Sequence, residues 1–296
     1  VAPAPSALLP LNAAVRGVNP VFSVHGGFGT VFDYGPLARR LEGRRQVIGL
    51  QSRMLVDPSW TDASLEAMAV NYAAEIRRMQ PRGPYSLVGW SLGGFLASLV
   101  AADLERGGER VDRLVMVDSF VPRQSDGSSR KEAIAHWADD LAGLLSAVLP
   151  NAAASRIKAQ ADAAKRADLP ETPESIRDLV ASVVEQGRSV RADDALLGAD
   201  DLSAAFAVGR HLNRLAQNTA LPRGLEAAPF CWWTSARLAQ RDRLETQLPK
   251  AVDRGLVGDN HFTILKHAGL LDELCDLFVQ ATASTIAQET VPEPAE

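Results

Sequence analysis

Short apolar runs alternate with longer amphipathic stretches over most of the chain, and this alternation predicts the fold. The apolar runs predict strands, which lie near Val21 and at Gln46–Leu50, Tyr85–Gly89, Leu114–Asp118, Phe230–Thr234 and Arg254–Val257. Stretches with helical periodicity separate them, at Tyr34–Leu41, Leu65–Met79, Gly94–Leu104 and Leu270–Val279. Strands that alternate with helices in this way predict an α/β fold, with a mostly parallel central sheet and helices on both faces.

The alternation stops between Asp118 and Phe230, in a stretch rich in Ala, Asp and Arg without a strand signal. Helical periodicity continues there, at Lys131–Val148, Ala153–Lys165, Ser175–Glu185 and Leu202–Gln217. One crossover between parallel strands needs about a dozen residues, so ordinary crossover helices account for only part of the stretch. An insertion at this place can fold over an active site. We therefore expect a helical lid over residues 124–217.

The two ends of the chain have the composition of linkers. The chain starts with Val1-Ala2-Pro3-Ala4-Pro5 and ends with Val291-Pro292-Glu293-Pro294-Ala295-Glu296. Segments of this kind cannot build a hydrophobic core. The 296 residues, of which 46% are hydrophobic and 23% charged, can bury one large core. We expect a linker over residues 1–18, one domain over 19–284 and a flexible tail over 285–296.

Charge and cysteine content narrow the function classes. The net charge is −5 and no basic stripe is present, which argues against a nucleic-acid binder. No apolar run approaches the length of a membrane span, and the start lacks the charged and apolar regions of a signal peptide. Cys231 and Cys275 fall in a predicted strand and helix, and we interpret both as reduced core residues. These features together predict a cytoplasmic protein that contacts neither nucleic acid nor membrane.

The pentapeptide Gly89-Trp90-Ser91-Leu92-Gly93 lies between a predicted strand and a predicted helix. A serine on such a turn adopts a strained backbone conformation, which the flanking glycines tolerate because they lack a Cβ atom. The turn raises the hydroxyl above the sheet, and the first amides of the helix point toward an oxyanion formed there. A serine that merely caps a helix is the alternative. The strand before and the helix after favour Ser91 as a nucleophile.

Two acid–base partners follow Ser91 in the order acid, then histidine, that this arrangement has. Asp118 ends the next predicted strand, and in a parallel sheet that is the edge where Ser91 emerges. His261 lies in a loop before the last predicted helix. In these roles neutral His261 takes the proton of Ser91, and Asp118 holds the imidazole in the productive tautomer. Asp259 is the rival acid, but a residue two positions from His261 would orient that ring poorly.

An oxyanion hole needs one amide from the residue after the nucleophile, here Leu92, and one from the loop after the first strand. That loop is His25-Gly26-Gly27-Phe28-Gly29-Thr30, whose glycines let the backbone approach a reacting carbonyl. We expect Gly27 to supply the second amide, with Phe28 as the neighbouring alternative, and His25 to brace the loop by hydrogen bonds. No metal site is expected. The candidate substrate-binding residues are aromatic neighbours of the predicted catalytic groups: Phe28, Trp90 and Phe262.

Four motifs together resemble the thioesterase domains that end nonribosomal peptide and polyketide synthetases. They are the loop His25–Gly27, the turn Gly89–Gly94, the strand end Val117–Phe120 and the loop Gly258–Phe262. The likeness runs from about Val21 to about Phe278. The family often has a proline after the histidine of the first loop, where this chain has Gly26.

The resemblance implies an α/β-hydrolase fold and a partner. The substrate would be a peptidyl or acyl thioester on the phosphopantetheine arm of an upstream acyl or peptidyl carrier protein domain, so the domain needs no cofactor of its own. Residues 1–18 would then be the linker from the carrier region.

We therefore expect a chain-terminating thioesterase, a serine hydrolase that takes the chain onto Ser91 and releases it by hydrolysis or intramolecular cyclisation. A stand-alone editing thioesterase or a small-ester serine hydrolase is the alternative within enzymes. The long predicted lid and the linker-like start count against it. A non-catalytic binding module on a hydrolase fold is the alternative outside enzymes. The intact set of Ser91, Asp118 and His261 argues against that alternative.

Overall fold

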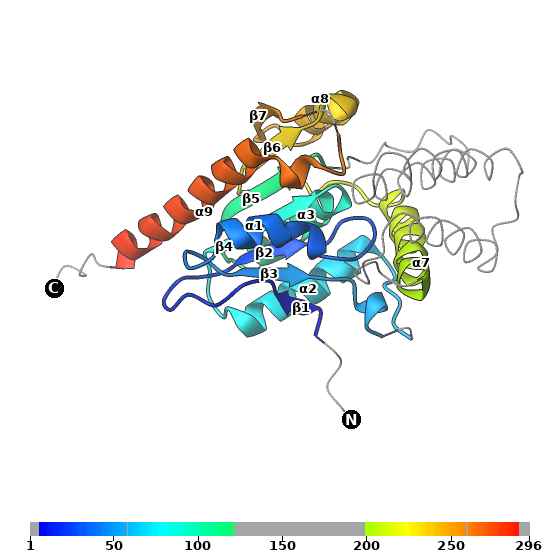
Figure 1. The fold of residues 1–296 in the computed structure, drawn as a ribbon, viewed down its shortest axis with the longest axis horizontal. Helices are drawn as coiled ribbons and strands as arrows, with labels where there is room; N and C mark the ends of the chain where they lie inside the picture. Colours follow the sequence, from blue (N-terminus) through cyan, green and yellow to red (C-terminus); the bar gives the residue numbers. More distant parts are fainter. Residues whose placement is uncertain (1–5, 58, 120, 122–198, 259, 290–296) are drawn as a thin grey trace, which may run out of the picture. The chain divides into compact units, whose positions relative to one another are not determined.

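The computed structural model describes residues 6–57, 59–119, 121, 199–258 and 260–289 (Figure 1). The chain divides into two compact units, residues 1–123 with 212–296, and residues 124–211. All of the predicted site residues belong to the first unit. Of the second unit only the first part of helix α7 (Ala199–Ala216) is described. That helix falls where the last lid helix is predicted, and the other three predicted lid helices lie outside the described residues.

The first unit is built on a mostly parallel sheet with seven strands among the described residues. In spatial order they are β1 (Leu8–Pro10), β3 (Val47–Leu50), β2 (Val21–Val24), β4 (Tyr85–Trp90), β5 (Val111–Val117), β6 (Pro229–Trp233) and β7 (Val252–Leu256). Every neighbouring pair is parallel except β1 and β3. The central strands β2, β3 and β4 are buried along their whole length, as strands covered on both faces must be.

Helices pack on both faces of this sheet (Figure 1). Helix α2 (Leu65–Met79) packs along α3 (Leu92–Arg106), and α1 (Gly35–Arg40) packs along α9 (Ala268–Glu289). Helix α8 (Leu238–Gln247) connects β6 to β7. Single turns of 3₁₀-helix lie at Phe32–Tyr34, Arg53–Leu55, Ser235–Arg237 and Ile264–Lys266. No helix within the described ranges has both the length and the apolar character of a membrane span.

The structure contains the six predicted strands and the four predicted helices around them, and α2 has the predicted bounds of Leu65–Met79. The sequence did not predict β1 or α8. Strand β1 falls inside the expected linker, so that linker does not extend over Leu8–Pro10. The buried carboxylate of Glu75 holds this segment, because it accepts hydrogen bonds from Ala7 N at 2.9 Å and from Ser6 Oγ at 3.1 Å.

Candidate active site

Ser91 occupies the sharp turn between β4 and α3 that the sequence predicts. Its backbone has φ 57° and ψ −127°, a conformation that costs a non-glycine residue about 1–3 kcal/mol. The turn is held by a hydrogen bond from Ser91 N to Val117 O at 3.0 Å. The Ser91 side chain therefore projects at the carboxyl edge of the sheet, between the ends of β4 and β5.

The glycines around Ser91 are required by close packing. A Cβ atom at Gly89 would overlap the backbone of Gly93, and one at Gly93 would overlap the carbonyl of Val24. A Cβ atom at Gly94 would overlap the hydroxyl of Ser119. The first contact lies within the turn, and the other two join it to β2 and to the residues after β5, so the turn keeps its shape only with glycine at these positions.

The structure brings Ser91, His261 and Asp118 into one hydrogen-bonded series. His261 Nε2 lies 3.0 Å from Ser91 Oγ, and His261 Nδ1 lies 2.6 Å from Asp118 Oδ2. Asp118 is fully buried and only 8% of the His261 side chain is exposed. Asp259, the rival acid, lies outside the described residues.

Thr234, directly after β6, is a fourth member of this series that the sequence analysis missed. It donates its backbone N–H to Asp118 Oδ1 at 2.8 Å and its hydroxyl to Asp118 Oδ2 at 2.9 Å. Asp118 itself has φ 45°, and its own N–H donates to Trp232 O at 2.7 Å. Contacts of this kind join residues far apart in the chain, so no local signal in the sequence announces them.

The charges in this series favour a neutral histidine next to an ionised acid. Burial alone would raise the pKa of Asp118, but the hydrogen bonds from His261 and Thr234 outweigh burial and lower it. Burial lowers the pKa of His261, and the charge of Arg237 acts in the same direction while Asp118 opposes it. A neutral imidazole with its proton on Nδ1 donates to Asp118 and leaves Nε2 free to accept the hydroxyl proton of Ser91.

Trp90 precedes Ser91 in the chain and also packs against His261. The centroid of its indole ring lies 4.8 Å from that of the imidazole, at an interplanar angle of 30°, and Nε1 donates to His261 O at 3.0 Å. Only 4% of Trp90 is exposed. Phe262 is half-buried, and its ring forms T-shaped pairs with His261 and Trp90, with centroids 5.1 Å and 6.2 Å apart. Of the three candidate substrate-binding residues, Trp90 is thus buried against His261, whereas Phe28 and Phe262 are partly exposed.

The two predicted oxyanion donors come from different segments of the chain. Leu92 begins α3, so its amide belongs to the first turn, where N–H groups have no partner four residues earlier in the helix. Gly27 lies in the loop after β2, and a Cβ atom there would have no neighbour within 4 Å. The buried side chain of His25 braces this loop, with Nδ1 2.7 Å from Gly26 O and Nε2 2.8 Å from Tyr72 Oη.

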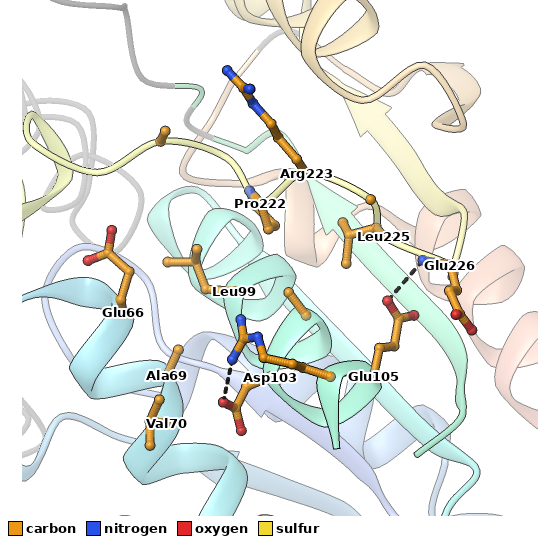
Figure 2. A pocket seen from close by; sticks show the side chains of 14 residues that line it. Glu66, Ala69, Val70, Leu99, Asp103, Glu105, Pro222, Arg223, Leu225 and Glu226 are labelled. Atoms are coloured by element: carbon orange, nitrogen blue, oxygen red, sulfur yellow. Dashed lines mark hydrogen bonds and ion pairs between the residues drawn. The ribbon is translucent and has the colours of Figure 1, made fainter. Parts of the chain in front are cut away.

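A cavity of about 490 Å³ lies elsewhere in this unit, between α2, α3 and the segment 220–226 (Figure 2). None of the predicted catalytic residues lines it. Three of its charged side chains have partners: Asp103 pairs with Arg106, and Glu105 accepts the backbone N–H of Glu226 at 2.9 Å (Figure 2). We therefore place the candidate active site at the carboxyl edge of the sheet and not in this cavity.

Comparison with known proteins agrees with this geometry. The family model for the thioesterase domain matches residues 19–281. The chain belongs to the thioesterase domain family. The resemblance inferred from the four motifs is therefore confirmed, and the α/β-hydrolase fold is that of solved members of the family. The Vlm2 thioesterase domain superimposes with a TM-score of 0.61 at 21% identity, over 92% of this chain and 96% of that one.

The relatives of this thioesterase domain are much longer proteins. Malpibaldin synthetase of Mortierella alpina is 35% identical over 133 residues, which are 42% of this chain and 2% of the synthetase. Polyketide synthase PksR of Bacillus subtilis (strain 168) is 41% identical over 112 residues, which are 38% of this chain and 4% of the synthase. The chain thus spans a small part of the length of these relatives.

Proposed function

We propose that this thioesterase domain terminates synthesis on a multidomain synthetase, by taking a peptidyl or acyl chain onto Ser91 and releasing it. The observation that carries the proposal is the series Ser91–His261–Asp118, at 3.0 Å and 2.6 Å, on a strained strand-to-helix turn. A serine next to a neutral, oriented imidazole is the arrangement that activates a hydroxyl for attack on an acyl group.

The first half of the reaction forms an acyl-serine ester. Ser91 Oγ attacks the carbonyl carbon of the thioester while His261 Nε2 takes its proton, and Asp118 stabilises the imidazolium that results. The oxyanion of the tetrahedral intermediate would lie against the amides of Leu92 and Gly27. When the intermediate collapses, the C–S bond breaks and the leaving thiolate takes the proton from His261.

The second half releases the chain. Water, or a hydroxyl or amine of the chain itself, gives a proton to His261 and attacks the ester carbonyl, and the Ser91 oxygen leaves as the proton returns to it. Attack by water gives a free acid and attack from within the chain gives a ring. Both outcomes use the same three side chains, so residues outside this series select between them.

The carrier that delivers the chain is inferred from the relatives. Synthetases such as malpibaldin synthetase and PksR are far longer than the matched region, and a chain held as a thioester on a phosphopantetheine arm can reach a separate domain. We assign the carrier domain as the partner and the phosphopantetheine arm as part of the substrate.

Mass spectrometry of the intact protein with an acyl thioester tests the assignment of the nucleophile. The wild type should gain the mass of the acyl group, and Ser91→Ala should not. Ser98→Ala is the matched control, because Ser98 lies in the same helix region but donates its hydroxyl to Phe95 O at 2.7 Å, inside the fold. An adduct on the Ser91→Ala protein would refute the assignment. If the wild type formed no acyl adduct and did not react with a fluorophosphonate, the alternative of a non-catalytic binding module would be favoured.

A further inference from the structure

Trp90 connects three parts of the candidate active site. Its backbone N–H donates to the hydroxyl of Tyr34 at 2.7 Å, and its indole Nε1 donates to His261 O at 3.0 Å. The ring also approaches the loop after β2, since a Cβ atom at Gly26 would lie 3.0 Å from Trp90 Cε3. The ring is therefore held by contacts with this loop and with the imidazole of His261.

The imidazole gains a positive charge in each half of the proposed reaction. Burial opposes that charge, and so does the positive charge of Arg237, whereas Asp118 favours it through Nδ1. The face of an aromatic ring attracts a cation within about 6 Å of its centroid, most strongly when the ring is an indole and the pair is desolvated. The two ring centroids lie 4.8 Å apart, with an interplanar angle of 30°, and both side chains are buried.

The geometry points to Trp90 as a positioning residue whose indole face stabilises the imidazolium form of His261 during each proton transfer. This inference rests on the proposed function, because it needs His261 to act as the base. It assigns to Trp90 a role different from substrate binding. The hydrogen bond from Nε1 fixes the backbone of His261, and the ring face acts on the charge that the side chain carries.

Fluorinated tryptophan at position 90 separates this role from packing. Fluorine withdraws electrons from the ring face but leaves the ring shape and the indole N–H in place, and it strengthens that N–H as a donor. A series from one to three or four fluorine atoms should lower kcat progressively, by about tenfold at the end of the series. The pKa of His261 should fall in parallel, so the acid limb of the rate of Ser91 labelling by a fluorophosphonate should move to lower pH.

Trp60 is the matched control, because its ring lies 4.2 Å from the guanidinium carbon of Arg53 and therefore also faces a cation. Fluorination there should change neither kcat nor the pH profile. Thermal unfolding would verify that the position-90 variants remain folded. A flat series at position 90 would overturn the role of Trp90 while wild-type labelling still supported the proposed function. A wild type without labelling at Ser91 would instead refute the proposed function.

Discussion

Thr234 holds the carboxylate of Asp118 with two hydrogen bonds, at 2.8 Å to Oδ1 and 2.9 Å to Oδ2, although 116 residues separate the two in the chain. With both oxygens engaged, the carboxylate cannot rotate, and Oδ2 faces His261 Nδ1 at 2.6 Å. The orientation of His261 therefore depends on β6 as well as on β5, because the residue that fixes the acid follows β6.

Thr234→Val should lower kcat about tenfold, because it removes the hydroxyl from a charged acceptor and keeps the backbone N–H and the side-chain shape. Steady-state kinetics with an acyl thioester would measure the loss. Thr219→Val is the matched control: Thr219 is also buried, and its hydroxyl donates to Leu215 O at 3.0 Å and lies 3.4 Å from the carboxylate of Glu66, away from the candidate active site. Equal losses in the two variants would mean that the effect of Thr234 is general destabilisation.

Asp118→Asn should lose roughly 10⁴ in kcat, because an NH2 group at the position of Oδ2 would donate to Nδ1 instead of accepting from it, which selects the wrong imidazole tautomer. Asp259→Asn should lose far less. The comparison of kcat for the two variants decides between the two acids that the sequence offered. A larger loss for Asp259→Asn would identify the loop residue as the acid.

The pH dependence of Ser91 labelling should show that His261 stays neutral at pH values where an ordinary histidine is already protonated. Burial lowers the pKa of His261 below 6.5, and the proposed mechanism needs the neutral form. The rate of Ser91 labelling by a fluorophosphonate should therefore be nearly constant from pH 8 to 6.5, and it should fall only as the pH drops through the lowered pKa. If the labelling rate falls to half at or above pH 6.5, Asp118 fully offsets the effect of burial on the pKa of His261.

The sequence revealed the side chains of the candidate active site but not their supports. Ser91, Asp118 and His261 could be found because each lies at or soon after the end of a predicted strand, and parallel strands end at one edge. Thr234 also follows a strand, but its role depends on a contact with Asp118 that has no periodic signal. Strand β1 was missed for a similar reason, because it has three residues and Glu75 in a distant helix holds the segment before it.

Gly26 packs closely against the Trp90 ring. Any side chain at this position would press on that ring, since a Cβ atom would lie 3.0 Å from Cε3 and 3.1 Å from Cζ3. Gly26→Ala should displace the ring by a few tenths of an ångström and reduce kcat several-fold without unfolding the protein. Gly35→Ala is the control, because its Cβ atom would meet only Arg39 Nη1, at 3.6 Å. Kinetics and tryptophan fluorescence of the two variants would test this, and an unchanged kcat in Gly26→Ala would contradict it.

His25 should make the fold less stable in acid. Burial lowers its pKa to about 4, while an unfolded histidine titrates near 6.5. Between these values the unfolded chain binds more protons, so the free energy of unfolding should fall as the pH decreases through this window, by roughly 3 kcal/mol at its lower end. His25→Gln removes the titrating group, although it also disturbs the contacts with Gly26 and Tyr72.

The difference between two pH curves isolates this effect from the rest of the chain. Urea unfolding of the wild type and of His25→Gln, measured from pH 7 to pH 4.5, gives the free energy of unfolding of each protein at each pH. His261 is present in both proteins, so its contribution to the free energy of unfolding cancels in the difference. The variant should be the less stable protein at pH 7 because it loses native hydrogen bonds, and its disadvantage should shrink steadily as the pH falls. A difference in stability that is constant over this range would show that the pKa of His25 does not change on folding, and that Tyr72 and Gly26 accommodate the charged ring.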